Sequence, residues 1–230
     1  MPDTPIKEAS AEARRILADA IVIDTLGGAV VHPTPYVAEG TYEERMVSQG
    51  WNVLHACLVS EPSYSPSYAK LLGAVYENLL NFEMSPKARH VERVDDIFEA
   101  KKNGQLGVIF GVQNSSWIEQ ERERIRIMHK LGLRSLQLTY MERNWVGDGC
   151  LEPENRGLTN FGMQVVRECN RLGILIDCSH VGIRTTLDAA KTSARPIVIS
   201  HTAVRAITEN PRCVTAAQVN PVADKGGTIG

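Results

Sequence analysis

The chain has 230 residues, of which 43% are hydrophobic and 23% are charged, and its formal net charge at neutral pH is -2. This length can bury a substantial core, as one large α/β domain or as two small ones. The nearly balanced charge, without a dense block of lysine and arginine, gives no electrostatic basis for binding nucleic acid or an anionic membrane. We therefore expect a soluble globular protein that acts on small molecules.

The cysteines and the N-terminal segment bear on the compartment. The five cysteines are Cys57, Cys150, Cys169, Cys178 and Cys213. Their odd number, wide spacing and lack of a C-x-x-C pair argue against a disulfide framework and against a cysteine zinc module. The first residues have a charged, helical pattern, and no later stretch reaches the length of a membrane span. We expect a cytoplasmic protein without an export signal or an anchor.

Short β-branched runs alternate with longer helical patterns along the chain. The predicted strands are 21–25, 52–59, 107–113, 135–140, 174–179, 197–200 and 227–230. After a first N-terminal helix, the predicted helices are 42–49, 67–81, 94–103, 119–131, 160–172, 185–191 and 216–225. This alternation is typical of βα units around a parallel sheet. Gly132 and Gly173 follow two of these helices and are expected to form left-handed caps.

No linker divides the chain, so we predict a single domain over residues 1–230. An open doubly wound sheet is the rival architecture, but it usually has a glycine-rich phosphate loop after its first strand. The sequence Asp24-Thr25-Leu26-Gly27-Gly28 is not such a loop. We therefore predict an α/β fold of the (β/α)8 TIM-barrel type, with seven strands visible and the chain apparently truncated before the eighth.

Two histidines follow neighbouring predicted strands. Ser179-His180 ends the strand 174–179, and Ser200-His201 ends the strand 197–200. Active sites of such barrels lie at the carboxyl ends of the strands. Neutral imidazole is a good zinc ligand, and zinc lowers the pKa of a bound water toward neutrality. The repeated Ser-His ending favours a metal site over two ordinary polar residues.

Other polar residues follow the remaining strands. Gln113 is equally compatible with a strand cap and with a contact to substrate or metal, since a neutral amide is a poor zinc ligand. Tyr140 could donate a hydrogen bond to a developing oxyanion, and Asn144 in the following loop is a candidate substrate contact. The carboxylates of that loop, such as Glu142 and Asp148, could supply a base but are more often solvated charges.

Two further residues have open alternatives. Asp24 could bind metal or cap the turn after the first strand, with equal weight. Arg212 could hold a substrate carboxylate through its planar guanidinium or be an exposed residue near a helix start. His32 and His55 lie near the first strands without paired spacing and are better explained as surface or core histidines, and nothing is assigned to His90 or His129.

These segments resemble the membrane (renal) dipeptidase family, peptidase family M19, in order and spacing from about Ala20 to Gly230. The segments that carry the resemblance are Gly157-Leu158-Thr159-Asn160-Phe161-Gly162, Asn170-Arg171-Leu172-Gly173, Ile176-Asp177-Cys178-Ser179-His180-Val181, Ser200-His201 and Asn210-Pro211-Arg212. The resemblance implies a two-zinc barrel that hydrolyses dipeptides. It maps His180 and His201 onto zinc ligands and Arg212 onto the residue that holds the substrate carboxylate, and it suggests a homodimer.

The sequence departs from this family pattern at several ligands. Leu26 and Gly28 occupy the places of the first-strand His-x-Asp, Gln113 stands for the bridging glutamate, and Tyr140 replaces the histidine that stabilises the tetrahedral intermediate. We therefore expect a hydrolase with one zinc ion, rather than two, that cleaves a dipeptide or a similar small amide. The alternatives are a silent barrel that binds a small carboxylated ligand and a metal-free enzyme that uses Glu142 or Asp148.

Overall fold

The computed structural model describes residues 9–27, 40–59 and 66–230. The seven strands form one parallel sheet in the order β1-β2-β4-β5-β6-β7, with β3 paired to β4. They are β1 (Ile23–Gly27), β2 (Val53–Cys57), β3 (Ala88–His90), β4 (Leu106–Val112), β5 (Leu133–Gln137), β6 (Leu175–Asp177) and β7 (Ile197–Val198). The helices are α1 (Ala11–Asp19), α2 (Tyr42–Ser48), α3 (Tyr68–Met84), α4 (Val94–Lys102), α5 (Glu123–Lys130), α6 (Asn160–Leu172), α7 (Ile183–Thr192) and α8 (Ala216–Asp224), with a 3-10 turn η1 (Ser116–Ile118). Within these ranges no helix has the length and apolar character needed to cross a bilayer.

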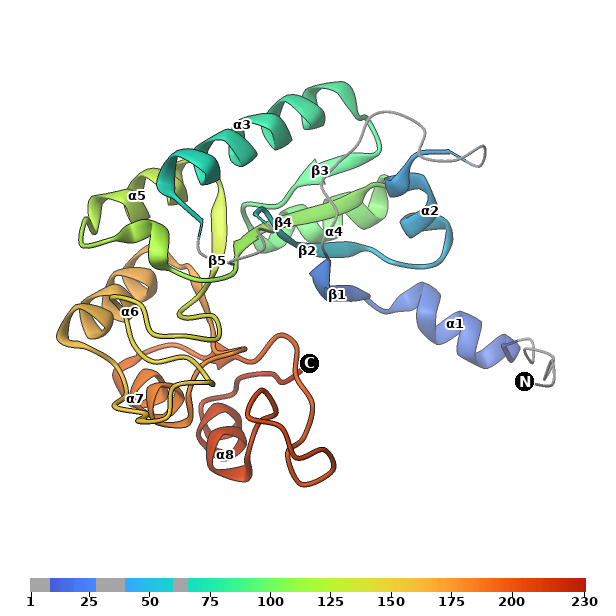
Figure 1. Cartoon of the computed structure of the whole chain (residues 1–230). Coiled ribbons are helices and arrows are strands. Elements are labelled where there is room, and N and C mark those ends of the chain that lie inside the picture. The colour runs from blue at the N-terminus through green and yellow to red at the C-terminus, as the bar shows by residue number, and fades with distance from the viewer. Residues whose placement is uncertain (1–8, 28–39, 60–65) are drawn as a thin grey trace, which may run out of the picture.

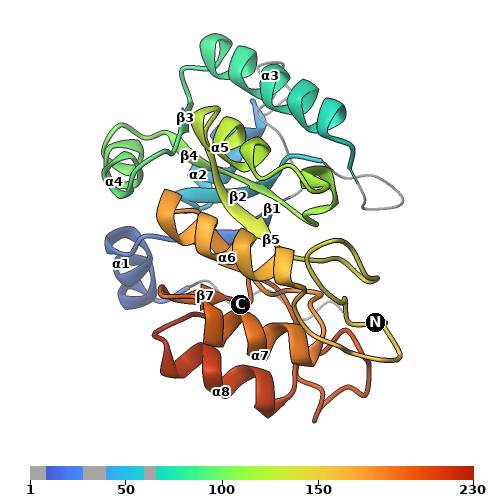
Figure 2. The ribbon, with the colours of Figure 1, turned by 90° about the vertical axis from the view of Figure 1, so that its left-hand side faces the viewer.

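The sheet curls into a half-barrel, with α3, α5, α6, α7 and α8 following one another around its outer side (Figures 1 and 2). At the carboxyl ends of the strands, the Thr25 hydroxyl of β1 donates to the carbonyl oxygen of Ser200, just after β7, over 2.7 Å. The α/β class and the parallel sheet predicted from the sequence are confirmed. The described residues form a half-barrel, not a closed barrel of eight strands.

Three elements differ from the sequence prediction. The predicted strand 227–230 is reduced to a single parallel bridge between Ile199 and Ile229. The predicted helix 119–131 begins later, at Glu123 of α5, and the turn η1 precedes it; Glu119 has a positive φ of 54, which cannot continue a helix. The short strand β3 was not predicted, since its three residues include the polar Arg89 and His90.

Helix α6 coincides with its predicted bounds because both of its ends are capped. The Thr159 hydroxyl accepts a hydrogen bond from the Gly162 backbone over 2.9 Å, which satisfies one free N–H of the first turn. Gly173 ends the helix with φ 79, and Gly132 follows α5 with φ 97. Both glycines have the predicted left-handed conformation, which costs little without a Cβ atom.

The central strand β4 has two different faces. Its side chains on the helix-facing side, which include Val108 and Phe110, are fully buried in the core. Gly111 faces the other side, where a Cβ atom would lie 2.1 Å from Nε2 of His55. The missing side chain therefore makes room for an imidazole on the inner side of the curl, while the outer side packs against the helices.

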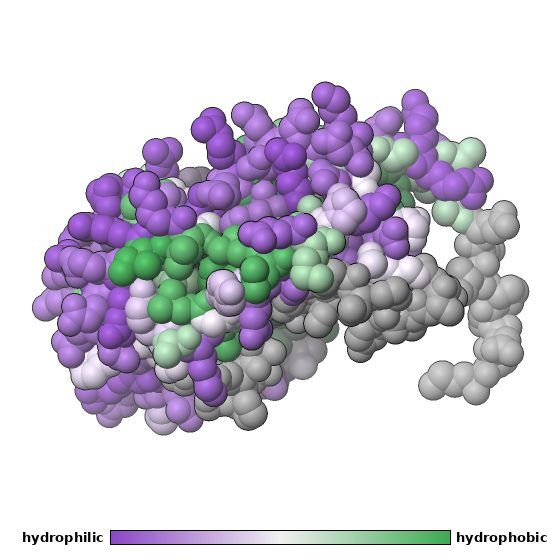
Figure 3. Space-filling model, turned by 90° about the horizontal axis from the view of Figure 1, so that it is seen from above, coloured by the Kyte–Doolittle hydropathy of each residue, from purple (hydrophilic) through white to green (hydrophobic). Residues whose placement is uncertain are grey.

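Helix α3 covers the sheet with Leu71 and Val75, which are buried. Its opposite side carries Tyr76, Leu80 and Met84 at intervals of four residues, with exposed fractions of 64%, 38% and 67%. Such spacing places the three side chains on one face of a helix. Figure 3 looks down on this side of the molecule and shows an apolar band between hydrophilic borders. The outer side of α3 thus exposes three large hydrophobic side chains next to charged residues such as Glu77.

Glu168 joins two helices and gives the fold a dependence on pH. Its carboxylate accepts hydrogen bonds from Arg171 on α6 and from Arg126 on α5 over 2.6 to 2.9 Å. The hydrogen bonds from Arg171, and then those from Arg126 against the effect of burial, lower the pKa of Glu168 to about 2. A lowered pKa stabilises the fold above the ordinary value of 4.5, and this contribution is lost as the pH falls toward 2.

We expect Glu168→Gln to unfold more easily than the wild type at neutral pH, with a difference that narrows as the pH falls from 4.5 toward 2. Both arginines are half exposed, so solvent screening keeps the effect below the full value of the pKa shift. Urea denaturation at several pH values measures it. The matched control is Glu77→Gln on the exposed side of α3; a Glu168→Gln difference that stays constant with pH would contradict the prediction.

Candidate functional site

His180 and His201 meet at the carboxyl ends of neighbouring strands. His180 lies three residues beyond β6, and His201 lies three residues beyond β7. Their ring centroids are 5.0 Å apart, and the two Nε2 atoms are separated by 2.9 Å. The structure therefore brings together the two histidines that the sequence indicated as a metal-binding pair.

Both imidazoles are neutral at neutral pH. Burial, and then the charges of Arg212 and His201, lower the pKa of His180 to about 2. Burial also lowers the pKa of His201, to about 4, against the opposing effect of the Asp177 carboxylate. Neutral imidazole is the form that binds a metal ion, so no proton has to be lost to solvent before binding at this pH.

Gln113 and Tyr140 complete the surroundings of the pair. The Gln113 side-chain Nε2 lies 3.1 Å from Nε2 of His201. The ring of Tyr140 stacks on His180, with centroids 4.0 Å apart and an interplanar angle of 23°. His180 itself has a left-handed backbone with φ 63, which is uncommon for a residue with a side chain and marks a locally constrained position. All four residues predicted for the centre of the site thus lie together.

Arg212 approaches the site from the loop before α8. Its guanidinium donates to the carbonyl oxygen of His201 over 2.7 Å and to the Thr202 hydroxyl over 3.3 Å. Burial lowers its pKa, and it forms no ion pair with a carboxylate of the described residues. The Asp177 carboxylate opposes this shift without pairing directly with Arg212, and a half-buried cation without a direct ion pair is costly unless an anion arrives from outside. The position therefore suits an anionic ligand beside the histidines.

Asp24 and Asn144, two of the predicted site residues, form hydrogen bonds away from the histidine pair. Thr25 directs its hydroxyl across the curl to Ser200, so its neighbour Asp24 points to the opposite face of β1. There Asp24 Oδ1 accepts from the backbone of Leu26 over 3.0 Å, which is the turn cap considered as the alternative. The structure does not bring Asp24 to the histidine pair, because the alternation of the strand turns it away.

Asn144 organises the loop that follows β5. Its Nδ2 donates to Asn114 Oδ1 over 2.7 Å and to the carbonyl oxygen of Leu138 over 2.9 Å. Its Oδ1 accepts from the backbones of Val146 and Gly147 over 2.7 and 3.2 Å. Both ends of this amide are engaged inside the protein, so the structure gives Asn144 a part in shaping the mouth rather than a free contact for substrate.

The loop carboxylates are placed unfavourably for base catalysis. Glu142 is exposed, whereas Asp148 is buried and accepts from Arg143 over 2.5 Å and from the Arg156 backbone over 2.6 Å. Burial acts to raise the pKa of Asp148, but these two hydrogen bonds hold it below its usual value. A carboxylate with a lowered pKa is a weak base, so the structure disfavours the metal-free alternative built on Asp148.

The remaining histidines have other surroundings. His32 lies outside the described residues. His55 Nδ1 is 2.8 Å from the carbonyl oxygen of Thr25, on the inner side of the curl. The His90 ring lies against Phe110, tilted by 36° with centroids 4.1 Å apart, and stacks on Phe82.

The histidine pair offers two nitrogen donors to a metal ion. Within residues 9–27, 40–59 and 66–230, no group of three or more His, Cys, Asp and Glu side chains could hold a metal. The two converging Nε2 atoms fit as ligands of one ion whose other positions are filled by Gln113, water or substrate, whereas protein zinc sites usually have three or four ligands. The side chains in these ranges do not fit a second ion.

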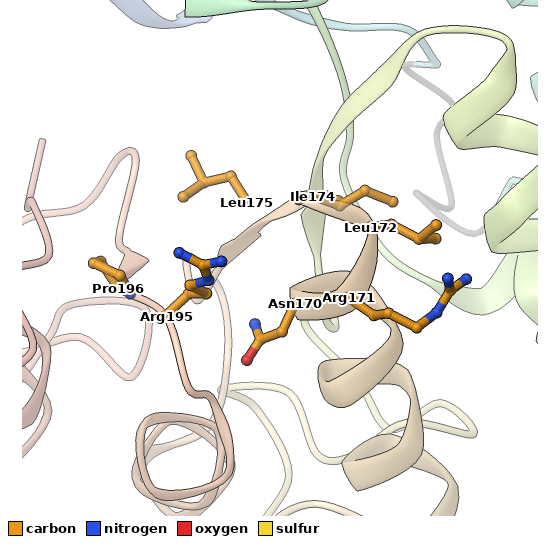
Figure 4. A pocket seen from close by; sticks show the side chains of 8 residues that line it. Asn170, Arg171, Leu172, Ile174, Leu175, Arg195 and Pro196 are labelled. Carbon is orange, nitrogen blue, oxygen red and sulfur yellow. The ribbon is translucent and has the colours of Figure 1, made fainter.

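A separate hollow of about 550 Å³ lies at the opposite end of the sheet, where β6 and β7 begin (Figure 4). Its lining includes Asn170, Leu175 and Arg195. Arg171 also lines it but is already paired with Glu168. In parallel barrels this end contributes to stability rather than to chemistry, so the hollow is distinct from the histidine site.

One important residue of the site was missed by the sequence analysis. Asp177 is buried beneath the histidines and accepts from the backbones of Ser179 and Ser200 over 2.9 and 3.1 Å. Its position three residues before His180 was part of the family resemblance, but no role was assigned to it. The available signal was a carboxylate at the carboxyl end of β6, the same strand end that leads to His180.

The described residues thus form a curled parallel α/β sheet with two imidazoles paired at its carboxyl edge. Residues 74–230 match the model of the membrane dipeptidase family (Peptidase family M19). The chain therefore belongs to the membrane dipeptidase family, as the resemblance in the sequence indicated.

Individual relatives agree with this assignment. Dipeptidase tcpJ of Claviceps purpurea (strain 20.1) is 28% identical over 132 residues, which cover 56% of this chain and 31% of that protein. The chain spans about a third of the length of the curated relatives that it matches.

Solved structures show the same fold. A structure described as an amidohydrolase from Pseudomonas aeruginosa has a TM-score of 0.84 and 28% identity, covering 94% of this chain and 63% of that one. A metallo peptidase from Rhodobacter sphaeroides, liganded with a phosphinate mimic of the dipeptide L-Ala-D-Ala, has a TM-score of 0.80 and 21% identity, covering 91% of this chain and 73% of that one. At that identity the second structure is a likeness of fold alone.

Proposed function

We propose that this chain forms most of a (β/α)8 barrel that hydrolyses a dipeptide or a similar small amide with the aid of one zinc ion. The observation that carries the proposal is the convergence of the two neutral imidazoles, with Nε2 atoms 2.9 Å apart, at the carboxyl ends of β6 and β7. Membership of the membrane dipeptidase family and the similarity to dipeptidase tcpJ support the substrate class.

In this proposal His180 and His201 hold the ion. A zinc ion at such a site lowers the pKa of a bound water and polarises a carbonyl group. Gln113, 3.1 Å from His201, orients the substrate amide or adds a weak ligand. Tyr140, stacked on His180, is placed to donate a hydrogen bond to the oxygen on which negative charge develops.

Arg212 determines the kind of substrate. Its guanidinium lies beside His201 without a carboxylate partner among the described residues. A free α-carboxylate on the substrate would supply the missing charge and hold the scissile amide near the histidines through a charge-assisted hydrogen bond. The proposal therefore favours peptides with a free C-terminus over neutral amides.

The test is zinc binding by the purified chain and by His180→Ala/His201→Ala. We expect about one zinc ion per chain by elemental analysis and calorimetry in the wild type, and none in the double variant, because both protein nitrogens are removed. The matched control is His129→Ala on α5, which should bind zinc as the wild type does. Equal zinc contents in the wild type and the double variant would refute the site.

A second candidate is a catalytically silent barrel that binds a small carboxylated ligand. It is favoured by the lack of a third strong ligand within the described ranges. It differs from the first in predicting that a dipeptide binds equally well before and after chelation, and that no dipeptide or small amide is turned over with added zinc. Zinc-dependent turnover that is lost in His180→Ala/His201→Ala excludes it.

A further inference from the structure

Beneath the histidine pair, one carboxylate collects four hydrogen bonds from two strand ends. Asp177 Oδ1 accepts from the backbone and hydroxyl of Ser179 over 2.9 and 2.8 Å and from the backbone of Ser200 over 3.1 Å. Its Oδ2 accepts from the Ser200 hydroxyl over 2.5 Å. Asp177 is 2% exposed, so these bonds replace water as its solvation.

The Ser200 hydroxyl also touches the ring of His201, with Oγ and Nδ1 separated by 2.8 Å. A hydroxyl has one proton, and a carboxylate can only accept. If Ser200 donates to Asp177, it can only accept from His201, so Nδ1 must carry the ring proton. The opposite arrangement, with Ser200 donating to Nδ1, would leave Oδ2 of a buried carboxylate without its donor.

The proton on Nδ1 also determines the state of Nε2, the other nitrogen of the His201 ring. In a neutral imidazole that is protonated at Nδ1, Nε2 has the free lone pair, and that is the atom that faces His180 and Gln113. His180 has no such constraint, because its buried Nδ1 has no hydrogen-bond partner in the described structure. The 2.9 Å contact then requires His180 Nε2 to donate to His201 Nε2. The two histidines are therefore unequal.

We propose that Asp177, acting through the Ser200 hydroxyl, is a positioning residue that holds His201 in the Nδ1-protonated tautomer and so keeps its Nε2 free to bind a ligand. The inference rests on the proposed function only in naming that ligand as a metal ion. The tautomer itself exists without metal, and ligating histidines elsewhere have their second nitrogen fixed in this way.

The test is the tautomer of His201, read from the ring nitrogens of the histidine-labelled, metal-free chain by long-range 15N–1H correlation. We expect His201 to be protonated at Nδ1 and His180 at Nε2 in the wild type. Asp177→Asn can donate its amide to Ser200 and free the serine proton for Nδ1, so we expect it to shift His201 toward the Nε2-protonated form. Wild-type His201 protonated at Nε2 would overturn the proposal before any variant is made.

The matched pair of variants is Ser200→Ala and Ser179→Ala. Each removes one hydroxyl from Asp177, but only Ser200 contacts the His201 ring. We expect mixed tautomers and about 10–100-fold weaker zinc binding in Ser200→Ala, rescue in Ser200→Thr, and an unchanged tautomer in Ser179→Ala. An unchanged tautomer in Ser200→Ala overturns the proposal. Absence of zinc binding in every variant, with the expected tautomers, counts against the proposed function alone.

Discussion

Replacing Gly162 with alanine is expected to destabilise the protein by about 3 kcal/mol, at the upper part of the range for overpacking. A Cβ atom at this position of α6 would lie 2.0 Å from the carbonyl oxygen of Val146. That oxygen also accepts from the Thr159 backbone over 2.9 Å, so it is fixed on the start of the helix. Backbone atoms cannot rotate away as a side chain can, and the helix or the loop must move.

The matched control is Gly73→Ala in α3, where a Cβ atom would meet nothing within 4 Å. Alanine loses less backbone entropy than glycine on folding, so this variant should be more stable than the wild type by about 0.5–1 kcal/mol. Urea denaturation of the wild type and both variants measures the two effects. If Gly162→Ala unfolds at the same midpoint urea concentration as the wild type, the loop can move away from the added methyl group without loss of stability, and the prediction is wrong.

The Gly162 contact also links stability to the site. Val146 belongs to the loop that Asn144 holds against β5, and this loop follows Tyr140, whose ring stacks on His180. A shift of the loop start should therefore disturb the stacking as well as the fold. We expect the near-ultraviolet circular dichroism of Gly162→Ala, but not of Gly73→Ala, to differ from that of the wild type.

The parts of the fold that could be predicted are those with a local signal. Helix α6 has a capping threonine before it and a glycine after it, and its predicted bounds were correct. The strand β3 depends on pairing with β4, and the late start of α5 depends on the backbone angle of Glu119; no periodicity of the sequence indicates either. Similarly, the last residues form a single bridge with Ile199, just after β7, because strand length is decided by the neighbouring strand.

The same distinction holds for the site. His180 and His201 could be predicted as neighbours because parallel strands end at one edge of a sheet. Asp24 could not be placed correctly from its position at a strand end, because the face on which it lies depends on the alternation of β1. The link from Asp177 through Ser200 to His201 spans two strands and could not be inferred from one segment.

The changes from the family pattern act together on the charge of the site. Gln113 is neutral where the resemblance places a glutamate, and Leu26 and Gly28 supply no ligand. The centre therefore contains two neutral imidazoles, a neutral amide and a phenol, with the carboxylate of Asp177 already engaged by hydrogen bonds. Fewer anionic ligands bind a divalent cation less tightly. This is the physical basis for expecting one ion rather than two. It is also the reason why substrate binding is expected to depend strongly on Arg212.

Replacing Arg212 with glutamine is expected to weaken the binding of a dipeptide by a factor of about 30 or more. The loss of one partner from a buried charge pair costs about 2 kcal/mol or more. The expected partner is the α-carboxylate, so the C-terminal amide of the same dipeptide should bind the wild type weakly and the variant no worse. Arg212→Lys should recover only part of the affinity, because an ammonium group cannot reproduce the planar guanidinium that also donates to His201 and Thr202.

Calorimetric titration of Ala-Ala and its C-terminal amide into the wild type, Arg212→Gln and Arg205→Gln measures this effect. Arg205 is the matched control: it lies in the same loop and donates to the carbonyl oxygen of Asn210, but it does not contact the histidines. Its variant should keep the preference for the free carboxylate. If Arg212→Gln still prefers the free carboxylate over the amide, another cation binds the carboxylate. Arg212 would then only hold the backbone of His201 through its hydrogen bond to the carbonyl oxygen.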